Sequence, residues 1–157
     1  MTAKAEFNAE EWSVVAGAPL LSAMMVIAAD RGGSVRESVA VGKAYAAARE
    51  QHDGELMSAL LATPPATAVQ RPANAEDLHG QATAQLREAV AIIERVGTGD
   101  EVVEYKRFVF GLAETVARAH KEGGFLGVGG KEVSEREQAA LDEIAAIFDE
   151  APPPPEA

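Results

Sequence analysis

The sequence predicts an all-α fold, a compact helical bundle made of two pseudo-symmetric helix-loop-helix halves. The main observation is a pattern that occurs twice: an apolar helix ends at Gly-Gly, and the next helix opens with Ser-x-x-Glu. The two copies span residues 28–37 and 119–137. Glycine after a helix supplies a left-handed residue, and Ser-x-x-Glu caps the free N–H groups of the following helix. An aromatic content of only 5% and many alanines also favour packed helices over a β-sandwich.

The first helix is expected to begin near residue 9, because Asn8 and Glu11 have the spacing of a capping box. Pro19 lacks an N–H and clashes with the carbonyl four residues earlier, so we expect a kink or break at residues 17–18. The apolar stretch 14–29 spans roughly 24 Å, less than the ~30 Å hydrocarbon core, and predicts a buried helix instead of a membrane span. Its expected core residues are Leu20, Leu21, Met24 and Ile27.

Helical spacing of apolar residues predicts further helices over residues 53–61, 75–96, 101–122 and 135–149. Gly97 is expected to end the helix 75–96, and Asp100 is expected to cap the helix 101–122. The apolar sector of 101–122 is wide enough to contact two neighbours. Another helix begins after Ser34. Its buried face is expected to contain Val35, Val39, Gly42, Tyr45 and Ala46.

The length of 157 residues predicts one domain. We expect a tail over residues 1–8, a helical domain over 9–149 with halves 9–62 and 75–149 joined by a Pro/Ala-rich loop, and a Pro-rich tail over 150–157. The absence of cysteine excludes disulfides and thiolate chemistry, and a net charge of −11 opposes binding to nucleic acid. No export signal is recognisable, so a cytoplasmic location is expected.

The glycine-rich segment 123–131 does not have the spacing of a nucleotide-binding loop, because a P-loop would need glycine at position 125 and Ser or Thr at position 132. Its three apolar residues have two interpretations. They either fold back as a plug of the bundle or form an interaction loop that docks on a partner. These residues are Phe125, Leu126 and Val128.

Acidic residues beside both Gly-Gly loops are candidate ligands for Ca²⁺ or Mg²⁺, since these cations prefer oxygen donors. EF-hand spacing is absent, however, and Glu37 and Glu137 already fit as helix caps. His120 lies on the apolar sector of its helix and is either an acid/base residue, working with a carboxylate, or a favourable cation at a helix end. His52 and His79 have the surroundings of surface residues. The candidate metal ligands are Asp30, Glu37, Glu122 and Glu137.

The two loop regions resemble the TerB-like fold, a compact all-α domain with two related halves found in bacterial tellurite-resistance and stress-response proteins. That resemblance implies cation contacts for the four acidic residues above and supplies no catalytic residue. The second copy departs from the family pattern in having Glu-Gly for Asp-Gly and an insertion over residues 125–132. The opening residues 7–12 also resemble small bacterial proteins without assigned function. The TerB-like resemblance is carried by Ala28, Ala29, Asp30, Gly32, Ser34 and Glu37, and again by Glu122, Gly123, Val133, Ser134 and Glu137.

Together these observations predict a non-enzymatic TerB-like module, associated with stress, that binds a protein partner or a second copy of itself. No cofactor is expected for that function. One alternative is a protein that binds a divalent cation through its acidic loops, and another is an enzyme that uses His120 with a carboxylate.

Overall fold

A computed structural model describes residues 2–29, 35–63, 73–122 and 133–149, and within this part the chain is helical. After a short 3-10 helix, Lys4–Glu6, six α-helices follow, which confirms the all-α prediction. Their bounds are α1 Ala9–Ala29, α2 Val35–Gln51, α3 Glu55–Ala62, α4 Ala75–Val96, α5 Gly99–Glu122 and α6 Glu135–Asp149.

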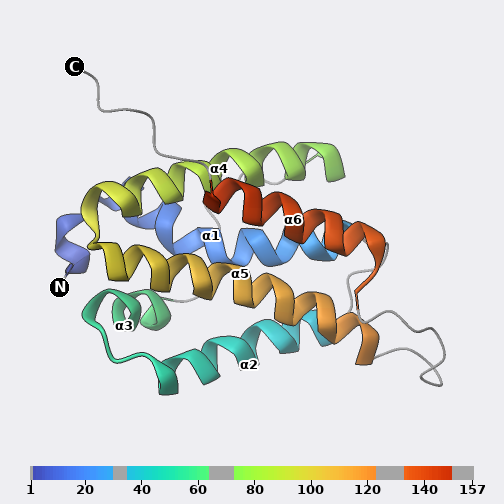
Figure 1. Cartoon of the computed structure of the whole chain (residues 1–157), viewed down its shortest axis with the longest axis horizontal. Helices are drawn as coiled ribbons and strands as arrows, with labels where there is room; N and C mark the ends of the chain where they lie inside the picture. The colour runs from blue at the N-terminus through green and yellow to red at the C-terminus, as the bar shows by residue number, and fades with distance from the viewer. Residues whose placement is uncertain (1, 30–34, 64–72, 123–132, 150–157) are drawn as a thin grey trace.

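Helix α1 is the central element of the bundle (Figure 1). It packs against α4, α5 and α6, whereas α2 lies at the edge and packs mainly on α5. Val15, Leu21 and Val26 of α1 are completely buried, as an apolar helix surrounded by others should be. By length and composition α1 could cross a membrane, but 56% of its most apolar window is buried inside the fold. Burial in the bundle accounts for its apolar character without a bilayer.

The predicted break at residues 17–18 is wrong, because α1 is one continuous helix from Ala9 to Ala29. The alternative, a kink at these residues, stays a prediction. Proline leaves the carbonyl of Val15 without its usual N–H donor four residues later. The hydroxyl of Tyr105 donates to that carbonyl at 2.7 Å from helix α5. One turn later, Ser22 Oγ lies 2.7 Å from the Pro19 carbonyl oxygen and 3.2 Å from that of Val109. A neighbouring helix therefore satisfies the polar group that proline leaves free.

Two of the predicted capping boxes, Asn8 with Glu11 and Ser134 with Glu137, are present in the described residues. Asn8 and Glu11 exchange side chain to backbone hydrogen bonds of 3.0 and 2.8 Å at the start of α1. At α5 the predicted cap, Asp100, is wrong by two residues. Thr98 accepts from the backbone N–H of Glu101 at 3.3 Å, and Glu101 accepts from that of Thr98 at 2.8 Å. Threonine at this position is the better cap because its carboxylate partner stands three residues later.

Glu101 also anchors the beginning of the described chain. Its carboxylate accepts from the backbone N–H of Thr2 at 2.8 Å and from the Thr2 hydroxyl at 2.5 Å. Burial opposes ionisation of this carboxyl group, but the hydrogen bonds from Thr2 and Thr98 outweigh it and lower the pKa of Glu101 to about 2. The ionised form therefore holds the N-terminal segment against the α4–α5 turn.

The buried faces agree with the sequence prediction on the inner helices and differ at the edge. On α5 the buried apolar residues include Tyr105, Val109 and Val116, and on α6 they include Leu141, Ile144 and Ile147, at the helical spacing that predicts both helices. On α2, Tyr45 is buried as predicted, but Val39 is 49% exposed and Val41 takes the inward position. Gly42 and Ala46, also predicted on the buried face, are exposed. On α1, Met24 is only half-buried, and Met25, at 4% exposure, is the core methionine. Because α2 packs mainly against one helix, its buried face is narrower than the sequence suggests.

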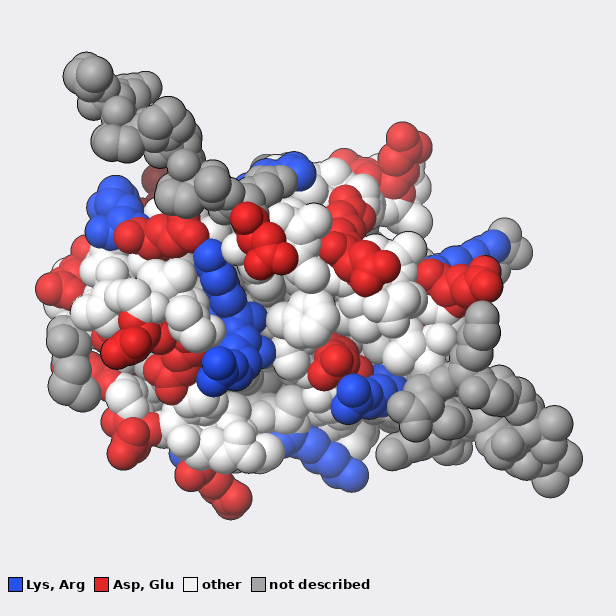
Figure 2. All heavy atoms as spheres, in the orientation of Figure 1, with Lys and Arg blue, Asp and Glu red and all other residues white. Residues whose placement is uncertain are grey.

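The two helix-loop-helix units differ in their packing. Helices α5 and α6 contact each other and both lie on α1, whereas α2 leaves α1 and packs on α5. Even so, α1 and α5 end, and α2 and α6 begin, at the same end of the bundle (Figure 1). The superposition of the two halves stays a prediction. Figure 2 shows Asp and Glu side chains spread over one face of the molecule, in keeping with the net charge of −11.

Candidate functional site

Most residues that the sequence singles out as a site lie outside the described residues. This applies to the interaction loop and to the side chain of His120, on which the enzyme alternative depends. Among the predicted metal ligands, only Glu137 has a described side chain. The residues concerned are Asp30, Phe125, Leu126, Val128 and the side chains of Glu37, His120 and Glu122.

The Glu137 side chain acts as a helix cap at the start of α6. It is 3% exposed, and its carboxylate accepts from the backbone N–H of Ser134 at 2.9 Å. In return, the backbone N–H of Glu137 donates to Ser134 Oγ at 3.1 Å. This confirms the predicted capping box. Within the described ranges, no three His, Asp or Glu side chains come together in a group able to hold a metal ion.

A groove between α2 and α5 is lined by both apolar and charged side chains. It encloses about 510 Å³. Ala44, Ala47 and Ala48 line the α2 side, and Phe108 and Gly111 are among the residues of the α5 side. Small side chains on both helices leave room above a floor of buried Ala48 and Phe108. This room and apolar floor suit the apolar face of a ligand.

Polar groups gather at one end of this α2–α5 groove. His52 Nδ1 and Glu104 Oε1 form a hydrogen-bonded pair, with side chains 22% and 35% exposed. Arg107 also lines the groove, and it forms no ion pair with any residue in the described part of the chain. His52 is expected in polar surroundings at the surface, and its side chain is partly exposed there, but it also has a carboxylate partner. Its partner lies 52 residues away on another helix, so no local pattern could indicate the pair.

Beside the groove, Tyr45 of α2 is buried with its ring edge against Phe108, the ring centroids being 5.4 Å apart. Its hydroxyl has no hydrogen-bond partner among the described residues. Burial raises the pKa of Tyr45 to about 12, although nearby Arg49 acts in the opposite direction. Arg49 itself donates from Nε to the carbonyl of Leu61 at 3.0 Å, which ties α2 to α3. Tyr45 therefore remains a neutral packing residue that fixes α2 against α5.

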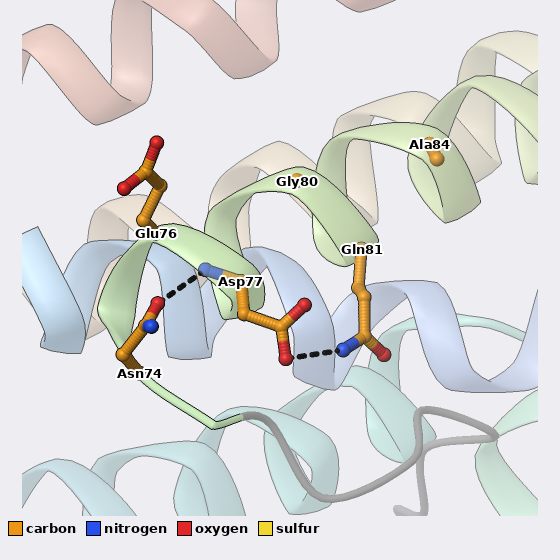
Figure 3. A pocket seen from close by; sticks show the side chains of 6 residues that line it. All are labelled: Asn74, Glu76, Asp77, Gly80, Gln81 and Ala84. Atoms are coloured by element: carbon orange, nitrogen blue, oxygen red, sulfur yellow. Dashed lines mark hydrogen bonds between the residues drawn. The ribbon is translucent and has the colours of Figure 1, made fainter.

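A second hollow, at the start of α4, carries no comparable chemistry (Figure 3). The side chain of Asn74 caps the helix by accepting from the backbone N–H of Asp77 at 2.8 Å. The Asp77 carboxylate accepts from Gln81 Nε2 at 3.0 Å and from the backbone N–H of Ala73 at 2.9 Å. The bond from Ala73, followed by that from Gln81, lowers the pKa of Asp77. These polar groups already satisfy one another, so the hollow is the capped end of a helix.

His79, the other histidine expected at the surface, is 53% exposed but also has an acidic partner. Its Nε2 lies 2.7 Å from Glu143 Oε2, and this pair joins α4 to α6.

Comparison of the whole chain with family models, with curated proteins and with solved structures finds no match.

Proposed function

We propose that the chain is a non-enzymatic, TerB-like helical module that binds a protein partner, and that an amphipathic helix of this partner docks in the α2–α5 groove. The observation that carries the proposal is the groove itself, which combines an apolar floor with Arg107 at its rim. Helix-in-groove recognition needs this combination, since the apolar face supplies affinity and a charged rim fixes the register.

The exposed apolar side chains support the same surface. Val39 and Val103, at 49% and 52% exposure, are the large hydrophobic side chains exposed in the described residues. One lies on α2 and the other on α5, the two helices that form the groove. Scattered exposed valines are ordinary on a protein surface, but here both lie on the groove helices.

Charge limits the chemistry of the partner. Arg107 has no carboxylate partner in the described part of the chain, so the docking helix should present one Asp or Glu to it. The net charge of −11 favours a partner that is otherwise basic, because opposite net charges speed association at low salt. We therefore commit to an amphipathic, predominantly basic helix with a single carboxylate facing Arg107.

The TerB-like assignment belongs to the same proposal. It is supported by the repeated Gly-Gly and capping-box pattern and by the meeting of both units at one end of the bundle (Figure 1). The resemblance would place the module in a bacterial stress response, with tellurite resistance as the best-known context, and in the cytoplasm.

The test compares two arginine substitutions on α2. Ala47→Arg fills the groove, whereas Ala46→Arg adds the same side chain to an adjacent exposed position that does not line it. Wild-type and variant proteins are immobilised, and proteins retained by wild type and Ala46→Arg but lost by Ala47→Arg are identified by quantitative mass spectrometry. Cross-linking then locates the bound segment, and titration calorimetry measures its affinity as a synthetic peptide.

We expect a basic, helical segment whose affinity falls at least about tenfold with Ala47→Arg and is unchanged with Ala46→Arg. Arg107→Glu should also weaken binding, and exchange of the partner's carboxylate for Lys should restore it. The proposal is overturned if no retained protein distinguishes the two variants, or if the groove variant instead abolishes self-association in sedimentation experiments, since the occupant would then be a second copy.

A further inference from the structure

A separate cavity lies at the end of the bundle where α1 finishes and α4 and α6 begin. It encloses about 350 Å³, within the size range of small-molecule sites. Its floor is apolar and comes from three helices, with Met25 of α1, Leu78 of α4 and Ala140 of α6 all buried. Because these elements also form the core, the floor is held rigidly and is suited to receive an apolar group.

The rim of this cavity carries both signs of charge. Glu76 lies in the first turn of α4 and Arg136 in the first turn of α6, and both line the cavity. They do not pair with each other, and neither has an ion pair with another described residue. Figure 3 shows the side chain of Glu76 pointing away from Asp77 and Gln81, which are already hydrogen-bonded to each other.

Arg136 is at a position that helix stability does not favour. The positive end of the helix dipole disfavours cations in the first turn. The remaining acid of the rim, Glu143, is already bonded to His79 at 2.7 Å. Among the described residues of the rim, one acid and one base without a partner, Glu76 and Arg136, thus line the same apolar cavity. A ligand with only a negative charge would be repelled by Glu76, and a ligand with only a positive charge would be repelled by Arg136. Neither kind of ligand matches the charges of the rim.

We propose that this cavity binds a small zwitterion with an apolar side chain, such as a free aliphatic or aromatic α-amino acid. The carboxylate of the ligand pairs with the Arg136 guanidinium, and its ammonium group pairs with the Glu76 carboxylate. The apolar side chain lies on Met25, Leu78 and Ala140. This site is distinct from the α2–α5 groove and does not depend on the function proposed for it.

The experiment uses the full chain and L-leucine, with binding followed by titration calorimetry and by the NMR shift of the Met25 methyl group. Three comparison ligands each lack one feature: 4-methylpentanoate has no ammonium group, 3-methylbutylamine has no carboxylate, and glycine has no apolar side chain. We expect saturable binding of leucine and at least about tenfold weaker binding of each comparison ligand.

Charge-neutral variants test the two rim residues. Arg136→Gln and Glu76→Gln should each weaken leucine binding by about tenfold or more, with thermal melts that remain cooperative. The matched controls are Glu88→Gln, on the exposed surface of α4, and Arg118→Gln, on α5, which remove the same charges outside the cavity and should leave the affinity unchanged. The inference is wrong if leucine shows no saturable binding, if it binds no tighter than the single-charge ligands, or if folded rim variants bind it as wild type does.

Discussion

The hydrogen bond from Tyr105 to Val15 offers a direct test of how a proline is accommodated inside α1. Tyr105 is 1% exposed and its hydroxyl lies 2.7 Å from the Val15 carbonyl oxygen, which Pro19 leaves without a backbone donor. Tyr105→Phe would leave that carbonyl buried and unsatisfied. We expect this to lower the free energy of unfolding by about 1–3 kcal/mol, the usual desolvation cost of an unpaired buried group.

Pro19→Ala tests whether the cost really comes from the proline. Alanine at this position returns the backbone N–H that can donate to Val15, so the hydroxyl of Tyr105 becomes less necessary. Urea unfolding of wild type, both single variants and the double variant gives a double-mutant cycle. We expect Tyr105→Phe to cost at least about 1 kcal/mol less in the Pro19→Ala background.

The control for this cycle is Tyr45→Phe. Tyr45 is also buried, but its hydroxyl has no partner among the described residues, so its removal should be neutral or slightly stabilising. If Tyr105→Phe costs the same in both backgrounds, within about 0.3 kcal/mol, the two residues are independent. The explanation for the unbroken helix would then have to be abandoned.

Three further outcomes are expected. Met25→Asp should destabilise the fold by several kcal/mol and Met24→Asp by clearly less, because only Met25 is almost completely buried; equal thermal shifts for the two variants would contradict this. The pKa of Glu101 is lowered to about 2, so its contribution to stability is complete above about pH 4.5 and is lost as pH falls toward 2. In urea unfolding across this range, the free energy of unfolding of Glu101→Gln should therefore depend less on pH than that of wild type. Glu137→Ala should cost about 1 kcal/mol and Glu137→Gln less, with or without added Ca²⁺ or Mg²⁺, and a loss of stability seen only with the metal would make this residue a cation ligand instead of a cap.

Local features of the fold could be predicted from the sequence because their causes lie within a few residues of each other. The cap formed by Asn8 and Glu11 and the end of α4 at Gly97 are of this kind. The continuity of α1 could not be predicted, since the donor that replaces the missing N–H of Pro19 stands on Tyr105, 90 residues from its acceptor. The exposure of Val39 likewise depends on how few helices cover α2.

The candidate sites were less accessible to sequence reasoning than the helices. The α2–α5 groove exists because small residues of two helices that are far apart in the sequence lie side by side in the fold. The pairing of His52 with Glu104 follows from the same packing. Neither helix alone contains a recognisable motif. The cavity that contains Arg136 is formed by three helices that are also far apart in the sequence. Periodicity identifies the inner face of one helix, but it does not identify which outer faces meet.

The central position of α1 has a consequence for the order in which the protein can fold during synthesis. α1 is made before α4, α5 and α6, which together cover it. Until the last of these helices leaves the ribosome, part of the apolar surface of α1 remains open to water. A nascent chain in this state is prone to aggregate and to bind chaperones. The segments 9–62 and 75–149 therefore cannot mature one after the other. A protease cut between residues 63 and 73 should leave two fragments that stay associated, because the apolar side chains of α1 in the first fragment are buried against α4, α5 and α6 in the second.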